Sequence, residues 1–220
     1  MSDDNIMPGN LPSLEQAGRQ HVLQALELLI QIFWTSDGRK NWEELWKSSS
    51  TVWTGLHGIV FREPPRIVIY LNELRDQGKE AVVIRDLENV FVDIFINTYG
   101  GISAPLYHSC YHGDEQRLMQ QPAQEMQERL SEAGLVPGKS GEPVDHLCLE
   151  LEYLYFLISL YQQSPDPEIA AETADFSGKF MLPWIDEFLQ RIPTDYHAAA
   201  FFAKSTEAMR DLLKMLGRTG

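Results

Sequence analysis

Asp145, His146 and Glu150 form a polar cluster at the beginning of a long apolar segment. His146 and Glu150 are four residues apart, so on a helix they lie on one face, with Asp145 directly before them. Polar groups at the mouth of a buried helix need internal partners or a ligand, because burying them unpaired is costly. A core histidine oriented by a carboxylate explains the pair as well as a metal does, and the His-Glu-x-x-His pattern of zinc proteases is absent. The cluster is therefore a candidate binding site.

A second polar group, His108, Cys110 and His112, alternates along a predicted loop. These side chains can converge on zinc, but the sequence marks no fourth ligand, so we expect no metal. Cys148 is two residues from His146, and on a helix the two side chains point in different directions, which excludes a thiol-protease pair. The Gly-x-Ser-x-Gly elbow, the Walker A loop and the Gly-x-Gly-x-x-Gly fingerprint are missing. The sequence therefore predicts neither an enzyme nor a cofactor.

A helix from His146 to Tyr161 must position the first cluster. Pro143 favours an extended or turn conformation in the residue before it, and Asp145 is a good N-cap. The residues that follow His146 are almost wholly apolar, so nearly every face of this helix should be buried. We therefore expect the helix at the centre of the protein.

Helical periodicity continues through the rest of the chain, and no convincing pair of strands and no internal repeat is present. Ser13 and Gln16 form a capping box for a first helix that runs to Trp34. The other expected helices cover residues 65–78, 79–97, 114–134, 166–182, 184–191 and 196–216, with Pro183 as a kink or fresh start and Asp195 as the last N-cap. The predicted fold is all-α, with about ten helices of mixed length.

Two helical lobes are expected, because residues 136–144 hold two glycines and two prolines. The expected division is a disordered tail over 1–12, an N-terminal lobe over 13–135, a hinge over 136–144 and a C-terminal lobe over 145–220. The hinge permits domain swapping, so the chain is expected to be a monomer or a swapped dimer. A Trp-rich stretch in the first lobe either fills gaps between helices or forms an aromatic surface for a partner; it holds Trp42, Trp46 and Trp53.

The net charge of −14 argues against nucleic acid as a partner and favours a basic one. Cys110 and Cys148 form no CxxC pattern and are expected to be small apolar residues in a reducing cytoplasm. The N-terminus lacks the basic region and apolar core of a signal peptide, and no apolar run reaches the ~18 residues that span a membrane. The sequence therefore predicts a cytoplasmic protein without stable membrane insertion.

Several motifs occur in an order and spacing that resembles the TorD/DmsD family of redox-enzyme maturation chaperones. They are Ala104-Pro-Leu-Tyr-x-Ser-x-Tyr111, Pro143-x-Asp-His-Leu147 with a following Glu-Leu-Glu, and Leu182-Pro-Trp184 with Phe188. The resemblance covers roughly residues 85 to 190 and implies a helical chaperone of the cytoplasm. Such a protein binds the twin-arginine leader, and in some members the body, of an apo-molybdenum oxidoreductase. It delays export until the molybdenum cofactor is inserted.

A receptor for such a leader needs carboxylates beside an apolar, aromatic-lined groove, since a leader combines two arginines with a short apolar stretch. Asp145, Glu150 and Glu142 are expected to supply the charge, with His146 holding the carboxylates by hydrogen bonding. The groove is expected to be lined by Trp184, Tyr111 and Leu147. The alternative hypothesis is a helical scaffold or assembly subunit that stays bound in an oxidoreductase complex.

Overall fold

The computed structural model describes residues 5–34, 40–97, 101–113, 118–136 and 141–219. These residues form an all-α fold, which confirms the predicted class, with slightly fewer helices than the ten expected. No β-strand occurs among them, only isolated bridges such as that between Ile6 and Phe61. The helices are α1 (Gln16–Phe33), α2 (Trp42–Gly55), α3 (Arg66–Asp76), α4 (Glu80–Phe91), α5 (Gln121–Glu132), α6 (Leu147–Gln163), α7 (Pro167–Asp175), α8 (Leu182–Arg191) and α9 (His197–Leu216). Short 3-10 turns cover Leu11–Ser13 and His108–Tyr111, and π-helical turns cover Val92–Ile96 and Phe176–Met181.

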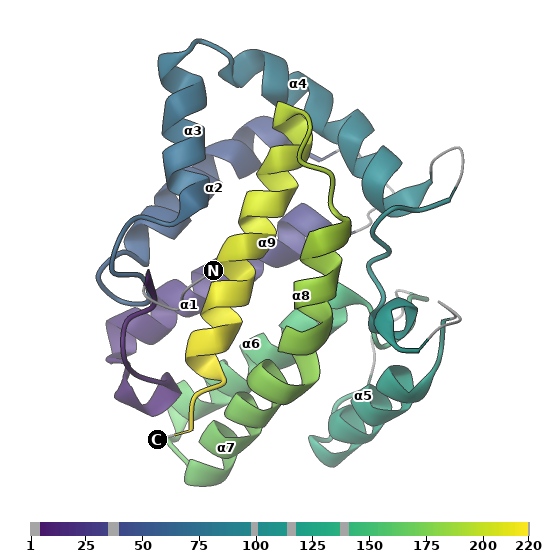
Figure 1. The fold of residues 1–220 in the computed structure, drawn as a ribbon. Coiled ribbons are helices and arrows are strands. Elements are labelled where there is room, and N and C mark those ends of the chain that lie inside the picture. Colours follow the sequence, from purple (N-terminus) through teal and green to yellow (C-terminus); the bar gives the residue numbers. More distant parts are fainter. Residues whose placement is uncertain (1–4, 35–39, 98–100, 114–117, 137–140, 220) are drawn as a thin grey trace.

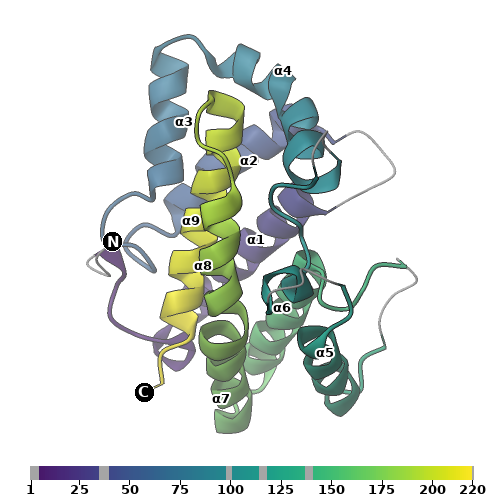
Figure 2. The same ribbon diagram turned by 45° about the vertical axis from the view of Figure 1, so that its right-hand side comes forward.

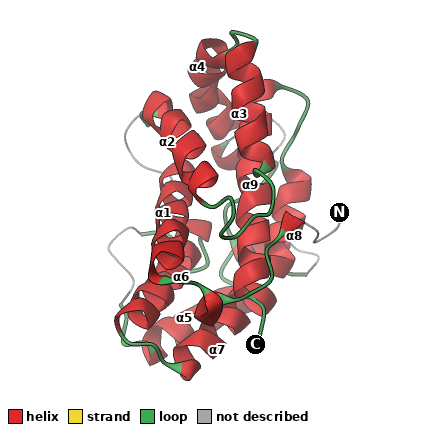
Figure 3. Ribbon diagram, turned by 90° about the vertical axis from the view of Figure 1, so that its left-hand side faces the viewer, coloured by secondary structure: helices red, strands yellow, loops and turns green. Residues whose placement is uncertain are grey.

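The helices pack in two rough layers, with α1, α2 and α6 on one side and α3, α8 and α9 on the other (Figure 1, Figure 3). In the first layer α1 packs against both α2 and α6, and in the second α9 packs against α3, α4 and α8. Helix α5 lies at the edge of the bundle, away from α3 and α4 (Figure 2). Within the described part of the chain, no helix is both long and apolar enough to cross a membrane.

One hydrophobic core joins helices from both sides of the expected hinge. Helix α1 from the N-terminal side packs along α6 from the C-terminal side, and α3 and α4 pack on α9. The division into lobes stays a prediction, and residues 137–140 of the expected hinge lie outside the described residues. Described residues on both sides of the expected hinge contribute to this one core.

Helix α6 carries an outer face that its apolar composition does not predict. Its inner residues, such as Leu151, Leu154 and Ile158, are fully buried. Glu152 is exposed, however, and Phe156, one turn further along, is only half-buried. The helix most enclosed by its neighbours is α9.

The three tryptophans of the Trp-rich stretch are core residues. Trp42 is 6% exposed, and Trp46 and Trp53 are fully buried. The Trp46 indole stacks on Phe201 of α9 at 5.5 Å between centroids. The prediction that these indoles fill gaps between helices is confirmed, and the alternative of an exposed aromatic surface is wrong.

The N-terminal segment differs from the expected disordered tail over its described residues. Ile6 and Leu11 are buried apolar side chains, and the Met7 amide donates to the Val60 carbonyl. Ser13 completes a capping box with Asn10 around the 3-10 turn, so it does not begin the first long helix. Helix α1 begins three residues later, because the local cap is already used.

Two later helix starts also differ from expectation. Residues 114–117 lie outside the described residues, 118–120 are not helical, and α5 begins at Gln121 with Pro122 in its first turn. Asp195 does not cap α9, whose N-cap is Tyr196 without a side-chain bond. At Pro183 the chain does continue as a helix, because the π-helical turn before it leads directly into the first turn of α8.

Gly178 and Gly217 meet where the π-helical turn crosses the end of α9. A Cβ placed on Gly217 would lie 2.6 Å from the Gly178 Cα and 3.0 Å from its nitrogen. Gly217 has a φ of −72°, which any residue adopts, so it is the close approach of two backbones that requires glycine here.

We expect Gly217→Ala to destabilise the fold by about 1–3 kcal/mol, the range for overpacking against atoms that cannot move aside. Urea unfolding monitored by circular dichroism measures the loss. Gly55→Ala is the matched control, because its Cβ would meet only the His21 side chain, at 3.2 Å. Equal unfolding midpoints for the two variants would contradict this account of the crossing.

Candidate functional site

Asp145 connects the beginning of α6 to the turn His108–Tyr111. Its Oδ2 accepts hydrogen bonds from both the amide, at 2.9 Å, and the hydroxyl of Ser109. The Ser109 hydroxyl oxygen in turn accepts from the Gln120 amide at 3.0 Å, directly before α5. Asp145 is fully buried and does not cap α6, so the predicted capping role is wrong. Its side chain joins three segments of the chain instead.

Backbone pairing supports the same junction. The His108 amide donates to the Asp145 carbonyl at 3.0 Å, and the Leu147 amide donates to the Leu106 carbonyl at 2.8 Å. Tyr107 and His146 form an isolated antiparallel bridge between these bonds. The motif containing Ser109 and the motif containing Asp145 therefore fold as one unit.

His146 is the residue that caps α6. Its Nδ1 accepts a hydrogen bond from the Cys148 amide at 3.1 Å, so the proton of the neutral ring is on Nε2. The ring lies between Trp34, at 5.6 Å between centroids, and Tyr107, at 5.1 Å. Burial lowers the pKa of His146 to about 4, so the ring is neutral at pH 7. It does not hold the carboxylates of Asp145 and Glu150, which corrects the expected role.

Glu150 finds its partners on other elements. Its Oε2 accepts from the Trp184 indole at 2.9 Å, and its Oε1 lies 3.1 Å from Nδ1 of His108. Burial raises the pKa of Glu150 well above its usual value and lowers the pKa of His108 to about 4. Both shifts favour the uncharged forms. The pair is therefore a neutral part of the core.

The three residues expected to line a groove are also buried. Trp184 is 2% exposed, Tyr111 8% and Leu147 not at all. The Tyr111 hydroxyl donates to the Pro105 carbonyl at 2.8 Å, and its ring lies 5.4 Å from that of Trp184. The Arg191 guanidinium lies 4.3 Å from the centroid of the Tyr111 ring. These side chains pack against one another, so in this structure they present no open surface.

Glu142 is the one residue of the predicted site that reaches the surface. Its Oε2 accepts from the Tyr107 hydroxyl at 2.7 Å, and it lines a groove of about 640 Å³ beside α5. We call this hollow the Met119 groove. Its lining residues are Met119, Ala123, Gln124, Gln127, Glu128, Gly141, Glu142, Pro143 and Val144.

Met119 stands out within this groove. Its φ of +60° is the only positive value for a residue other than glycine in the described chain, and its side chain is 64% exposed. Such a backbone persists only where neighbouring contacts impose it, and here the next residue is bound to Ser109. The junction at Asp145 therefore helps to place an apolar side chain in contact with solvent.

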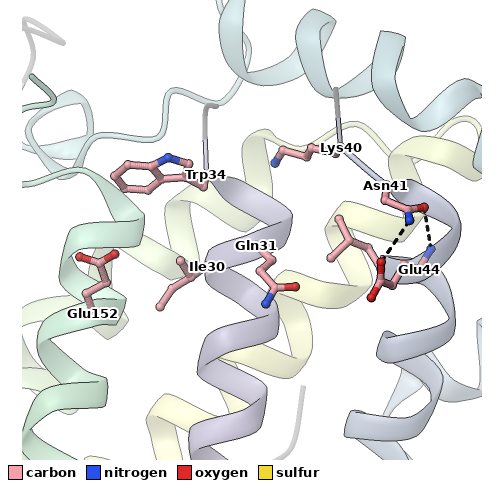
Figure 4. Close-up of a pocket in the computed structure, with 8 residues that line it drawn as sticks. Ile30, Gln31, Trp34, Lys40, Asn41, Glu44 and Glu152 are labelled. Atoms are coloured by element: carbon pink, nitrogen blue, oxygen red, sulfur yellow. Dashed lines mark hydrogen bonds between the residues drawn. The ribbon is translucent and has the colours of Figure 1, made fainter. Parts of the chain in front are cut away.

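A second hollow lies on the other side of His146, and we call it the Trp34 pocket (Figure 4). It has a volume of about 480 Å³ and is lined by Ile30, Gln31, Trp34, Lys40, Asn41, Glu44, Leu45 and Glu152. Trp34 links it to the buried cluster, since the Trp34 indole contacts the His146 ring. The segment Glu142–His146 thus lies between two surface hollows.

Neither hollow has the groups of a reacting centre. No group of three or more His, Cys, Asp or Glu side chains among the described residues is arranged to hold a metal ion. His108, one of the three loop side chains that were considered for zinc, contacts Glu150. Carboxylates beside apolar and aromatic side chains are suited to binding a peptide that is both basic and apolar.

Sequence reasoning missed the residues that complete both hollows. Ser109 lies in one of the family motifs, and its hydroxyl could have been predicted to donate to the buried carboxylate of Asp145. Glu152 stood in the quoted Glu-Leu-Glu motif but was assigned no role. Met119, Trp34 and Glu44 carried no local signal, because the two hollows draw their lining from separate helices and segments.

The structure is an all-α bundle with surface hollows, and comparison with known proteins gives its family. The family model described as nitrate reductase delta subunit matches residues 68–190, and the chain belongs to this family.

Relatives with curated names are chaperones. The chaperone protein TorD of Vibrio cholerae serotype O1 (strain M66-2) is 33% identical over 135 residues, which cover 59% of each chain. That of Vibrio parahaemolyticus is 29% identical over 132 residues, covering 57% of this chain and 59% of the relative. That of Aliivibrio salmonicida is 29% identical over 154 residues, covering 68% and 69%. The match to the first two therefore spans less than two thirds of their length.

A solved structure of a redox enzyme maturation protein from Archaeoglobus fulgidus shares the fold. Its TM-score is 0.53 at 22% identity, over 88% of this chain and 94% of that one.

The buried histidines predict an acid dependence of stability. His146 has a pKa of about 4 when folded and an ordinary value of 6.5, so between these values the unfolded chain binds a proton that the folded chain does not. Above pH 6.5 this difference in proton binding does not lower the free energy of unfolding. The free energy of unfolding decreases as the pH falls from 6.5 towards 4. The loss is about 2 kcal/mol at pH 5.

His146→Asn keeps a good N-cap and removes the titrating group. We expect its free energy of unfolding to fall less between pH 7 and pH 5 than that of the wild type, with the dependence of His108 retained. Parallel pH slopes in urea unfolding would show that His146 does not have the lowered pKa.

Proposed function

We propose that the chain is a maturation chaperone that binds the leader of an apo-molybdenum oxidoreductase. Binding the leader, which contains two arginines and an apolar stretch, delays export until the molybdenum cofactor is inserted. Three observations support the proposal: the family, the chaperone names of the relatives and the acidic, partly apolar hollows at the predicted site. In this proposal the chain has no catalytic role.

The Met119 groove is the observation that carries the proposal. Glu142, a predicted peptide-binding residue, lies in it, and Met119, Ala123 and Val144 provide an apolar surface. Among the described residues, its lining contains the carboxylates Glu128 and Glu142 and no Lys or Arg. A peptide with apolar residues near basic ones is complementary to such a lining, because apolar contact gives affinity and opposite charge orients the peptide.

The buried residues of the predicted site have a different role in this proposal. Asp145, His146 and Glu150 position the surface, and Leu147, Tyr111 and Trp184 form the packed base beneath it. Asp145 acts through Ser109 and Gln120 on Met119, and His146 acts through Tyr107 on Glu142. A peptide needs to touch none of these six side chains for them to affect its binding.

Leader binding should weaken as ionic strength rises. The net charge of −14 attracts a basic peptide, and exposed charges are screened over ~8–10 Å at physiological salt. Calorimetry with a synthetic peptide that has two adjacent arginines before a Leu-rich stretch measures the effect. Affinity should fall but not vanish at high salt, because the apolar stretch still buries surface. No detectable binding at low salt would refute the proposed function.

Met119→Gly should weaken binding of the same peptide about tenfold, since burying such a side chain contributes roughly 1.5 kcal/mol. Glycine adopts a φ of +60° readily, so the fold should be as stable as the wild type. The control is Leu118→Ala, which removes a neighbouring side chain that is 48% exposed and does not line the groove. If both variants bind as the wild type does, the apolar stretch does not occupy this groove.

A further inference from the structure

The Trp34 pocket is a second hollow beside the same buried cluster, and its charges are unevenly paired. Glu44 is oriented by Asn41, whose side chain donates to the Glu44 carboxylate at 3.0 Å and accepts from the Glu44 amide. Glu152 is exposed and makes no hydrogen bond or ion pair within the described residues. Figure 4 shows Trp34 and Glu152 on one side of the pocket and Glu44 on the other, with Gln31 between them. Two carboxylates thus border one hollow.

Among the described residues that line the pocket, Lys40 is the only cationic one, and its ammonium group is already engaged. It donates to the Ile32 carbonyl and lies 3.9 Å from the centroid of the Phe91 ring and 5.1 Å from that of Trp42. Burial lowers the pKa of Lys40 to about 8. Lys40 therefore forms an ion pair with neither Glu44 nor Glu152. Both carboxylates stay available to an incoming cation.

Glu152 also lines an apolar pocket of about 220 Å³ further along α6. The other residues of this pocket are Leu130, Leu135, Val136, Leu149, Tyr153 and Phe156. Among these residues Val136 is 89% exposed. The outer face of α6 therefore carries an acidic, Trp-lined hollow and an apolar hollow that share one carboxylate. Burial also raises the pKa of Glu152, and a bound cation would offset this cost of desolvation.

We propose that the Trp34 pocket binds the paired basic side chains of the client peptide, with Glu152 and Glu44 as the acceptors and Trp34 as a stacking surface. Arginine suits this site better than lysine, because its planar guanidinium both stacks on an indole and bonds a carboxylate with two parallel donors. The inference rests on the proposed function for the identity of the peptide, and it adds where the arginines bind.

The test is a cycle between two peptides and three variants of the full chain. One peptide has two adjacent arginines before a Leu-rich stretch, and the other has glutamines in their place. Glu152→Gln and Glu44→Gln each remove one carboxylate of the pocket. Glu43→Gln is the matched control, because Glu43 is a neighbouring carboxylate on α2 that pairs with Lys47 and does not line the pocket.

We expect Glu152→Gln to weaken the arginine peptide about tenfold and to leave the glutamine peptide within twofold of its wild-type affinity. Glu44→Gln should act in the same direction, and Glu43→Gln should change neither. Trp34 gives an independent readout, because it is half-buried whereas the other four tryptophans are 6% exposed or less. The arginine peptide should therefore protect the fluorescence from quenching by acrylamide more than the glutamine peptide does.

Two outcomes would overturn the inference, and they are distinguishable. If the arginine peptide binds the wild type and both pocket variants equally, the proposed function stands and the arginines bind elsewhere. If neither peptide binds the wild type at low salt, both the proposed function and this inference fail.

Discussion

The hydrogen bonds between Asp145 and Ser109 are the interaction on which the rest of the site depends. A buried carboxylate is tolerated in a protein interior only where donors compensate it, and here one oxygen receives two. Replacing Asp145 removes the acceptor of two Ser109 donors, and replacing the Ser109 side chain removes one of the two donors to Asp145, so the two residues constrain each other. Because Ser109 also accepts from Gln120, the same interaction fixes the approach to α5. One side wall of the Met119 groove is thus set by a contact that no ligand reaches.

Burial changes what the Asp-His pair can do. Side chains that are fully enclosed cannot exchange water for a peptide without opening the fold. In the proposed function they influence binding through what they hold in place: Met119 through Ser109, Glu142 through Tyr107, and Trp34 through direct contact with the His146 ring. A substitution at Asp145 or His146 can weaken binding without removing a contact to the peptide. Affinity measured alone cannot separate these cases, whereas stability and affinity measured together can.

The sequence predicted elements whose signals are local. Apolar periodicity placed α3 and α9 close to their expected ranges of 65–78 and 196–216, since it depends only on nearby residues. The site was harder to predict for a physical reason. Asp145 is a residue type that favours the N-cap position. Its carboxylate can equally accept hydrogen bonds from donors that are 36 residues away in the sequence, and the fold places those donors beside it. For the same reason Glu150 does not pair with His146, as expected, but with His108 and Trp184, which lie on other elements.

Charge is divided between the core and the surface of this chain in a way that suits a basic ligand. Three buried groups of the site are brought towards neutrality, because burial lowers the pKa values of His108 and His146 and raises that of Glu150. These three groups therefore contribute little to the long-range field, to which surface carboxylates such as Glu44, Glu128 and Glu152 contribute. A field of this kind accelerates encounter with any basic peptide but does not discriminate among them. Discrimination must come from close contacts, and both hollows combine a carboxylate with apolar or aromatic surface within one lining. A peptide that is only basic, or only apolar, would satisfy half of either one.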